Sequence, residues 1–144
     1  MILGIGTDII EIERFRLSIH RFGDRFISKL FTANEIAYCR SQQDPSSCFA
    51  ARFAAKEAFS KAIATGNTGI FRWKDIELIY LPNGEPALQF YNAIQEKLHA
   101  YKTSLTLSVS ELSVLAFVTI QANSDSKSVT PKPISDRGSL LQYP

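Results

Sequence analysis

Apolar and small residues alternate at the start of the chain and predict a buried strand over residues 2–9. The two-residue period of a strand separates two faces: Leu3, Ile5, Thr7 and Ile9 on one, and Gly4, Gly6 and Asp8 on the other. The two glycines leave the second face bare, so we expect another element to approach the backbone closely there. Asp8 stands at the end of that face, near the expected junction with a helix.

Helical spacing of apolar residues predicts most of the remaining framework. An apolar stripe over about 11–31 indicates a helix that is interrupted at Gly23. Thr32 and Glu35 fit a capping box that opens a short helix. The further elements that we expect are a helix over 45–64, strands over 75–81 and 87–90, a helix whose apolar face runs from Phe90 to Tyr101, and strands over 105–110 and 114–121.

This order of elements predicts an α+β fold in a single compact domain over residues 1–121. We expect a small, mostly antiparallel sheet packed against the long helix over 45–64. Residues 122–144 are rich in serine and proline and have little to bury, which predicts a polar, flexible tail.

The segment from Arg52 to Lys61 is the most informative part of that long helix. At about 100° per residue, its two sides have different chemistry. One half of the circumference carries, in order, Arg52, Lys56, Ser60, Phe53, Glu57 and Lys61, and the other half is mostly alanine. Alanines let a helix lie close to a sheet. Cations around a single acid suit a polyphosphate that is bound together with a divalent metal ion.

Each of these charges also has a simpler interpretation. Glu57 and Lys61 are four residues apart, which is the spacing of an ordinary helix ion pair. Arg52 and Lys56 have the same spacing but repel each other unless an anion binds between them, and the alternative for this pair is a solvated basic face.

Residues near the first strand leave similar alternatives open. Asp8 is either a functional carboxylate or the N-cap of the helix that begins near Glu11. Arg14 and Arg21 are either surface charges or contacts for an acidic partner.

Composition narrows the possible functions. The net charge of +2 is too small for a protein whose main partner is bulk nucleic acid. The chain has no membrane-length apolar run and no secretory leader, so we expect a cytoplasmic protein in which Cys39 and Cys48 are free thiols. His20 and His99 do not cluster with each other or with cysteine, which argues against a zinc site.

Two motifs together resemble a known family. Gly4-Ile5-Gly6-Thr7-Asp8-Ile9 is followed by Phe53-Ala54-Ala55-Lys56-Glu57-Ala58-Phe59-Ser60-Lys61. The pair is similar to the bacterial holo-[acyl-carrier-protein] synthases, which are short phosphopantetheinyl transferases. The resemblance extends over roughly residues 1–121.

The resemblance implies an activity and a site. The family moves the 4′-phosphopantetheine arm of coenzyme A to a serine of apo acyl carrier protein, releases adenosine 3′,5′-bisphosphate and supports fatty acid biosynthesis. It implies Mg²⁺ held by Asp8 and Glu57, and catalytic roles for Glu57 and Lys61. The residues implied to bind the coenzyme are Arg52, Lys56, Lys61 and Gly66.

The resemblance also implies partners. Arg14 and Arg21 would meet the acidic carrier protein, and family members of this length work as homotrimers with sites between subunits. No nucleic acid and no membrane are expected as partners. Glu111 stands where many members carry histidine or aspartate after a Ser-Val-Ser-like strand.

Two rival functions use the same basic helix. A non-catalytic phosphate- or nucleotide-binding module would bind coenzyme A without magnesium and without turnover. A small nucleic-acid binder would show steeply salt-dependent binding, although the low net charge argues against it.

Overall fold

The computed structural model describes residues 1–64 and 71–123. In chain order the elements are β1 (Ile2–Glu11), α1 (Ile12–Leu30), α2 (Ala33–Arg40), α3 (Pro45–Ala64), the 3-10 turn η1 (Trp73–Asp75), β2 (Ile76–Tyr80), β3 (Pro86–Phe90), α4 (Asn92–Leu98), β4 (Tyr101–Val109) and β5 (Ser113–Ala122). Each predicted element is present, although α4 is shorter than its apolar pattern suggested. Phe90 and Tyr101 belong to the flanking strands. The tail expected over 122–144 falls outside the described residues from 124 onward.

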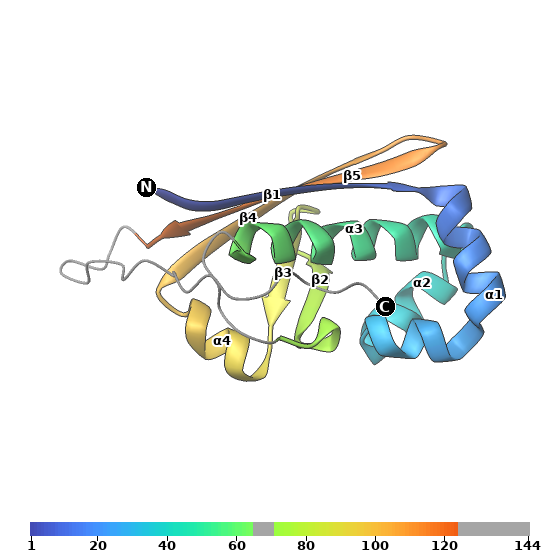
Figure 1. The fold of residues 1–144 in the computed structure, drawn as a ribbon, viewed down its shortest axis with the longest axis horizontal. Coiled ribbons are helices and arrows are strands. Elements are labelled where there is room, and N and C mark those ends of the chain that lie inside the picture. The colour runs from blue at the N-terminus through green and yellow to red at the C-terminus, as the bar shows by residue number, and fades with distance from the viewer. Residues whose placement is uncertain (65–70, 124–144) are drawn as a thin grey trace.

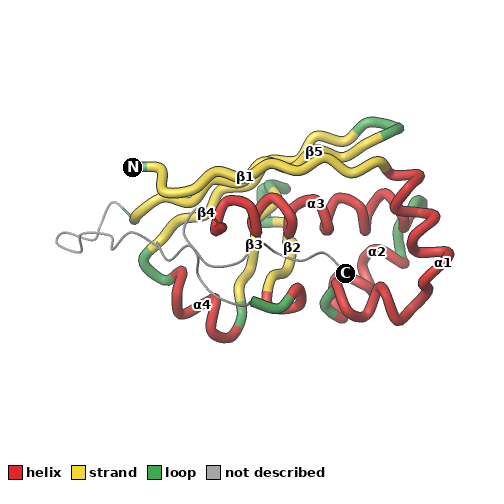
Figure 2. The backbone as a smooth tube through the Cα atoms, viewed as in Figure 1, coloured by secondary structure: helices red, strands yellow, loops and turns green. Residues whose placement is uncertain are grey.

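Helix α3 is the centre of the architecture. Strands β1, β5 and β4 form an antiparallel sheet in that order, and β2 pairs with β3 in a separate antiparallel hairpin. α3 runs along the three-stranded sheet and also contacts β2 (Figure 1). Helices α1 and α2 lie at one end of α3. Helix α4 lies on the opposite side of the β2–β3 hairpin from α1 and α2 (Figure 2). The α+β prediction, with a small antiparallel sheet on the motif-bearing helix, is confirmed.

The closest approach between α3 and the sheet is at Gly6. A Cβ atom built on Gly6 would lie 1.8 Å from the Ala58 carbonyl oxygen and 2.6 Å from the Ala62 nitrogen. Both atoms are backbone, so a side chain there would force the strand and the helix apart. The buried alanines on this side of α3 allow the same approach from the helix. The prediction that the glycine face of the strand lies against another element is therefore confirmed.

The opposite face of β1 departs from the prediction of a buried strand. Ile9 is 63% exposed and Ile5 is 50% exposed. On β5, Leu115, which pairs with Ile9, and Phe117, which pairs with Thr7, are also exposed. The glycine side of β1 is covered by α3, whereas no described element packs over the outer side. The two-residue period and the glycines identified the face that α3 covers, but they could not show that the other face is left uncovered in the single chain.

Local signals at the helix ends are confirmed. Gly23 interrupts α1 with φ 65° and ψ −153°, a combination that favours glycine. The Thr32 hydroxyl accepts a hydrogen bond from the Glu35 nitrogen, and the Glu35 carboxylate accepts one from the Thr32 nitrogen. This is the expected capping box.

The two cysteines form a disulfide, contrary to the prediction of free thiols. α2 packs on α3, and this contact brings Cys39 and Cys48 to a Cα–Cα separation of 5.4 Å. The prediction was drawn from the expected compartment and not from any knowledge of which helices touch. No described helix is long and apolar enough to cross a membrane.

Candidate active site

Strand β1 and helix α3 bring two carboxylates and one ammonium together. Asp8 follows Gly6 on the face of β1 that lies against α3, and its side chain is 14% exposed. The Lys61 ammonium donates to Asp8 Oδ1 at 2.8 Å and to the Thr7 carbonyl oxygen at 3.1 Å. Glu57, one turn before Lys61 on α3, is only 6% exposed. The sequence placed these three residues in one site, and the structure brings them together.

The electrostatics of Glu57 reflect this neighbourhood. Burial raises the pKa of the Glu57 carboxyl above its usual 4.5, and the negative charge of Asp8 raises that pKa further. The positive charge of Lys61 acts in the opposite direction. Because the charge of Asp8 disfavours the ionised form of Glu57, a cation placed between the two carboxylates would stabilise the pair.

Asp8 has an oxygen suited to such a cation. Its Oδ2 atom is buried and has no hydrogen-bond partner among the described residues. A buried oxygen without a partner is costly. Within residues 1–64 and 71–123, no group of three or more histidine, cysteine, aspartate or glutamate side chains could hold a metal ion. Mg²⁺ commonly uses only one or two carboxylates together with substrate phosphates, so the donor set fits this ion.

The alternative role of Asp8 as a helix cap is excluded. Asp8 lies within β1, and the N-cap of α1 is Glu11, whose side chain makes no capping hydrogen bond. The carboxylate of Asp8 is thus available to the site. The sequence also suggested a simple ion pair of Lys61 with Glu57 within the helix. Lys61 instead forms an ion pair with Asp8, which joins α3 to β1.

Lys56 lies on another side of α3 from this site. Its Nζ atom donates to the Leu30 carbonyl oxygen at 2.7 Å, to Glu35 Oε1 at 2.5 Å and to the Trp73 carbonyl oxygen at 3.0 Å. Burial lowers the pKa of the Lys56 ammonium, while Glu35 opposes that change. The predicted exposed cationic face is therefore wrong for this residue, which is 0% exposed.

Arg52 is also buried, at 3% exposure, and sits beside α2 and the end of β2. Its guanidinium lies over the Tyr38 ring, 4.6 Å from the centroid, and 6.0 Å from the centroid of Tyr80. Nη1 contacts Cys48 Sγ at 3.0 Å, whereas Nε has no hydrogen-bond partner among the described residues. The structure thus divides the predicted polar side: Arg52 and Lys56 face other elements, and Glu57 and Lys61 face β1.

The remaining predicted residues lie on elements other than β1 and α3, or outside the description. Arg14 and Arg21 are exposed on α1, and the Arg21 guanidinium lies 5.2 Å from the centroid of the Phe22 ring. Gly66 lies outside the described residues. Glu111 is exposed in the turn between β4 and β5.

Sequence reasoning missed the buried carboxylates around Lys56. Glu35 was assigned only to the capping box, and Glu77 was given no role. Glu35 is 1% exposed and forms an ion pair with Lys56. The signal that was available is the alternation in β2, where a glutamate stands between Ile76 and Leu78 inside an apolar strand.

Comparisons with known proteins identify the family of the chain. Residues 4–117 match the family described as the 4′-phosphopantetheinyl transferase superfamily. The holo-[acyl-carrier-protein] synthase of Koribacter versatilis is 42% identical over 124 residues, which cover 84% of this chain and 99% of that protein.

Solved structures give the same result. The holo-[acyl-carrier-protein] synthase of Neisseria meningitidis superposes with a TM-score of 0.77 at 35% identity, covering 84% of this chain and 99% of that one. The Bacillus anthracis synthase, in a structure described as a complex with CoA (3′,5′-ADP), gives 0.69 at 31% identity and covers 85% and 99% of the two chains. Both motifs lie inside the matched region. The chain therefore belongs to the 4′-phosphopantetheinyl transferase superfamily and, within it, to the holo-[acyl-carrier-protein] synthases.

Proposed function

We propose that this chain transfers the 4′-phosphopantetheine arm of coenzyme A to a serine hydroxyl of an apo acyl carrier protein and releases adenosine 3′,5′-bisphosphate. The observation that carries the proposal is the convergence of Asp8, Glu57 and Lys61 in a member of this family. The Bacillus anthracis relative, described as a complex with CoA (3′,5′-ADP), supports the identity of the donor. The rival binding module has the same contacts but predicts no turnover.

Asp8 and Glu57 would hold Mg²⁺, which when bound supplies positive charge to the pyrophosphate of the coenzyme. Lys61 adds a fixed positive charge beside Asp8, where the leaving oxygen gains negative charge. The carrier serine oxygen attacks the phosphorus that bears the pantetheine arm. The bond from that phosphorus to the bridging oxygen breaks, and its electron pair leaves with adenosine 3′,5′-bisphosphate. Glu57, which lies in the same site, accepts the serine proton.

The test of this function is a mass measurement. The purified protein is incubated with coenzyme A, Mg²⁺ and an apo carrier protein, and the carrier is weighed. Transfer adds one phosphopantetheine mass to the carrier. An unchanged carrier mass, when a reference synthase modifies the same carrier, would reject the proposal. Coenzyme binding without a mass gain would favour the binding module.

Helix α1 offers the surface for the carrier. Arg14 and Arg21 are seven residues apart and both exposed, and Leu17 and Phe22 beside them are 60% and 54% exposed. A basic helix face with exposed apolar side chains suits an acidic, amphipathic partner.

Charge reversal tests this surface. Arg21→Glu is expected to raise the KM for the carrier about tenfold, because charges at the rim of an interface steer association. The KM for coenzyme A should stay unchanged. Steady-state kinetics with each substrate varied in turn measures both values, and Lys74→Glu on η1 is the control for a reversed exposed charge. Equal effects of the two variants would remove α1 from the carrier interface.

We also propose a homotrimer, with the coenzyme site shared between neighbouring subunits. The outer face of β1 and β5 supports it, because Ile5, Ile9, Leu115 and Phe117 form an exposed apolar surface. A surface of this kind on a sheet is typical of a contact between chains.

A charged residue in this surface should separate the chains. Ile9→Asp is expected to reduce the solution mass from three chains to one and to lower the transfer rate. Analytical ultracentrifugation gives the mass, and Leu81→Ser in the β2–β3 turn is the control at another exposed apolar residue. A wild-type protein that sediments as a single chain would contradict the trimer.

A further inference from the structure

A buried polar network occupies the side of α3 turned away from Asp8. Its centre is the ion pair of Lys56 with Glu35, whose side chains are 0% and 1% exposed. Besides Lys56, the Glu35 carboxylate accepts hydrogen bonds from the Thr32 nitrogen at 3.0 Å and from the Leu78 nitrogen at 3.1 Å. The three partners of this carboxylate lie at the start of α2, on α3 and on β2.

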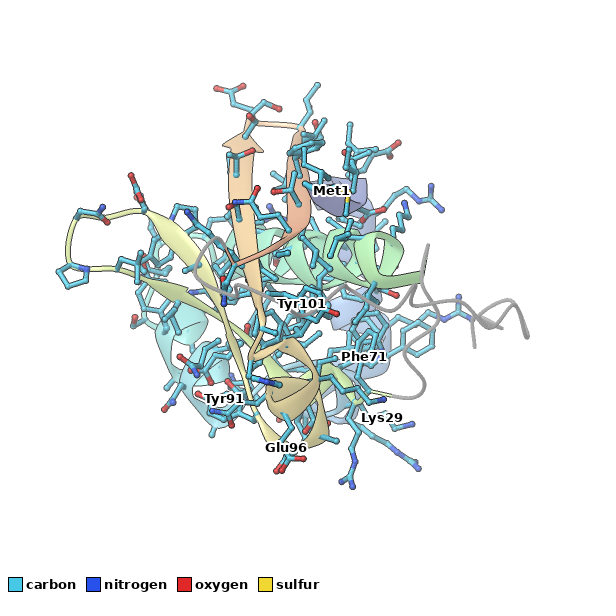
Figure 3. All side chains as sticks on the ribbon, turned by 90° about the vertical axis from the view of Figure 1, so that its left-hand side faces the viewer. Met1, Lys29, Phe71, Tyr91, Glu96 and Tyr101 are labelled. Atoms are coloured by element: carbon cyan, nitrogen blue, oxygen red, sulfur yellow. A yellow bond between two sulfur atoms is a disulfide. The ribbon has the colours of Figure 1, made fainter. Side chains whose placement is uncertain are left out.

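Glu77 extends the network toward α4. Its carboxylate accepts hydrogen bonds from the Thr32 hydroxyl at 2.5 Å, from the Asn34 amide at 3.5 Å and from the Tyr91 hydroxyl at 3.3 Å. Tyr91, labelled in Figure 3, stands directly before α4. Two carboxylates and one ammonium are thus enclosed between α2, α3 and the β2–β3 hairpin.

We infer that Lys56 is a positioning residue and not a phosphate ligand: its ammonium fixes the rotation of α3 so that Glu57 and Lys61 face Asp8. This inference rests on the proposed transferase function for its kinetic consequences. Its structural part, the energetic coupling between Lys56 and Glu35, does not depend on that function.

The hydrogen-bonding capacity of Lys56 is the first argument. An ammonium has three N–H groups, and Lys56 uses them on the end of α1, the start of α2 and η1. To contact a phosphate, Lys56 would leave the buried Glu35 carboxylate without its counter-charge. Breaking a buried pair in this way is strongly unfavourable.

The geometry of α3 is the second argument. Lys56 and Glu57 are consecutive residues, so a rotation of the helix that released one would move the other. Contacts hold α3 from two sides: Lys56 on the side of α2 and η1, and the backbone approach of Gly6 on the side of β1. Together they set the direction in which Glu57 points.

The experiment compares Lys56→Met with the double variant Lys56→Met/Glu35→Gln. The single change leaves a buried carboxylate unpaired, so the unfolding midpoint should fall by about 10 °C. The transfer rate at saturating substrates should fall about tenfold through misplacement of Glu57, with the KM for coenzyme A within about twofold of wild type. Glutamine can still accept the capping hydrogen bond from the Thr32 nitrogen, but its amide nitrogen cannot accept the one from the Leu78 nitrogen. The double variant should therefore regain about half of the loss in midpoint and, because it lacks the ammonium, little of the transfer rate.

Lys61→Met is the comparison, because Lys61 is 49% exposed and lies beside Asp8. It is expected to raise the KM for coenzyme A about tenfold and to lower the transfer rate, with a smaller fall in the unfolding midpoint than Lys56→Met, because the Lys61 side chain is half exposed. The inference is overturned if Lys56→Met raises the KM for coenzyme A as Lys61→Met does. It is equally overturned if the double variant regains the midpoint but keeps a raised KM.

Should Lys56→Met fail to fold, the double variant alone decides: a wild-type KM for coenzyme A supports positioning, and a raised KM refutes it. If the wild-type protein proves to transfer nothing, the proposed function fails. The midpoints of the single and double variants then still test the pairing of Lys56 with Glu35.

Discussion

Gly6→Ala is expected to be among the most damaging single substitutions in the protein, although it adds only one methyl group. The added Cβ would lie 1.8 Å from the Ala58 carbonyl oxygen, a backbone atom that cannot turn aside. β1 must therefore move away from α3. The cost is about 3 kcal/mol of unfolding free energy, at the upper end for overpacking a core. Asp8 is two residues further along β1 and moves with it, so transfer should fall together with stability.

Urea unfolding and the carrier mass assay measure the two losses. Gly84→Ala is the matched control, because Gly84 has φ 85° but no atom within 4 Å of an added Cβ. Left-handed backbone strain there should cost about 1 kcal/mol and leave transfer unchanged, since the residue lies in the β2–β3 turn. If the two variants lose the same stability, the close approach of β1 to α3 is not the cause.

The framework of the site could be predicted because its signals are local. The bare strand face around Gly6 and the alanine half of α3 each point to close packing, and they fit each other. The capping box at Thr32 and the interruption at Gly23 depend on a few neighbouring residues and were also correct. Asp8 and Glu57 follow from this packing, because each lies beside the contact.

The environment of each polar residue on α3 could not be predicted in the same way. A helical wheel gives the angle of a side chain but not what lies opposite. Lys56 therefore looked like part of an exposed cationic face, whereas Glu35, Leu30 and Trp73 enclose it. Three contacts from distant parts of the chain decide the role of Lys56, and no residue near Lys56 in the sequence predicts them.

The same limit explains the two corrections to the fold. The disulfide between Cys39 and Cys48 depends on the packing of α2 on α3. The exposed face of β1 depends on what covers the sheet, and in the single chain α3 covers only the glycine side. The alternation along β1 predicts two faces of different composition but not what covers each. A partner chain on the outer face would bury Ile9, as the sequence led us to expect.

Glu57→Gln is expected to abolish transfer and yet to leave the metal-free protein at least as stable as the wild type. The loss of rate should be on the order of a thousandfold, because one change removes a carboxylate for Mg²⁺ and the proposed proton acceptor. Stability behaves in the opposite way. Burial and the charge of Asp8 raise the pKa of Glu57, so its ionised form is unfavourable in the folded state without metal. Neutral glutamine removes that cost.

The sign of the pH dependence follows from this raised pKa. Below the usual carboxyl value of 4.5, Glu57 is protonated in both states and the two proteins should differ little. As the pH rises through 4.5 toward the raised pKa, the wild type loses stability relative to the variant, because the Glu57 carboxyl releases its proton first in the unfolded chain. The variant should therefore show the higher unfolding midpoint at neutral pH in the presence of a chelator.

Adding Mg²⁺ should reverse the order of the two proteins. Ligand binding to the folded state raises the midpoint of the wild type, whereas Glu57→Gln should respond weakly or not at all. Glu96→Gln, an exposed change on α4, is the control and should follow the wild type in rate and in metal response. Thermal unfolding with chelator and with Mg²⁺, beside the mass assay, gives all the values. An Mg²⁺ response in Glu57→Gln equal to that of the wild type would remove Glu57 from the metal site, even if transfer were lost.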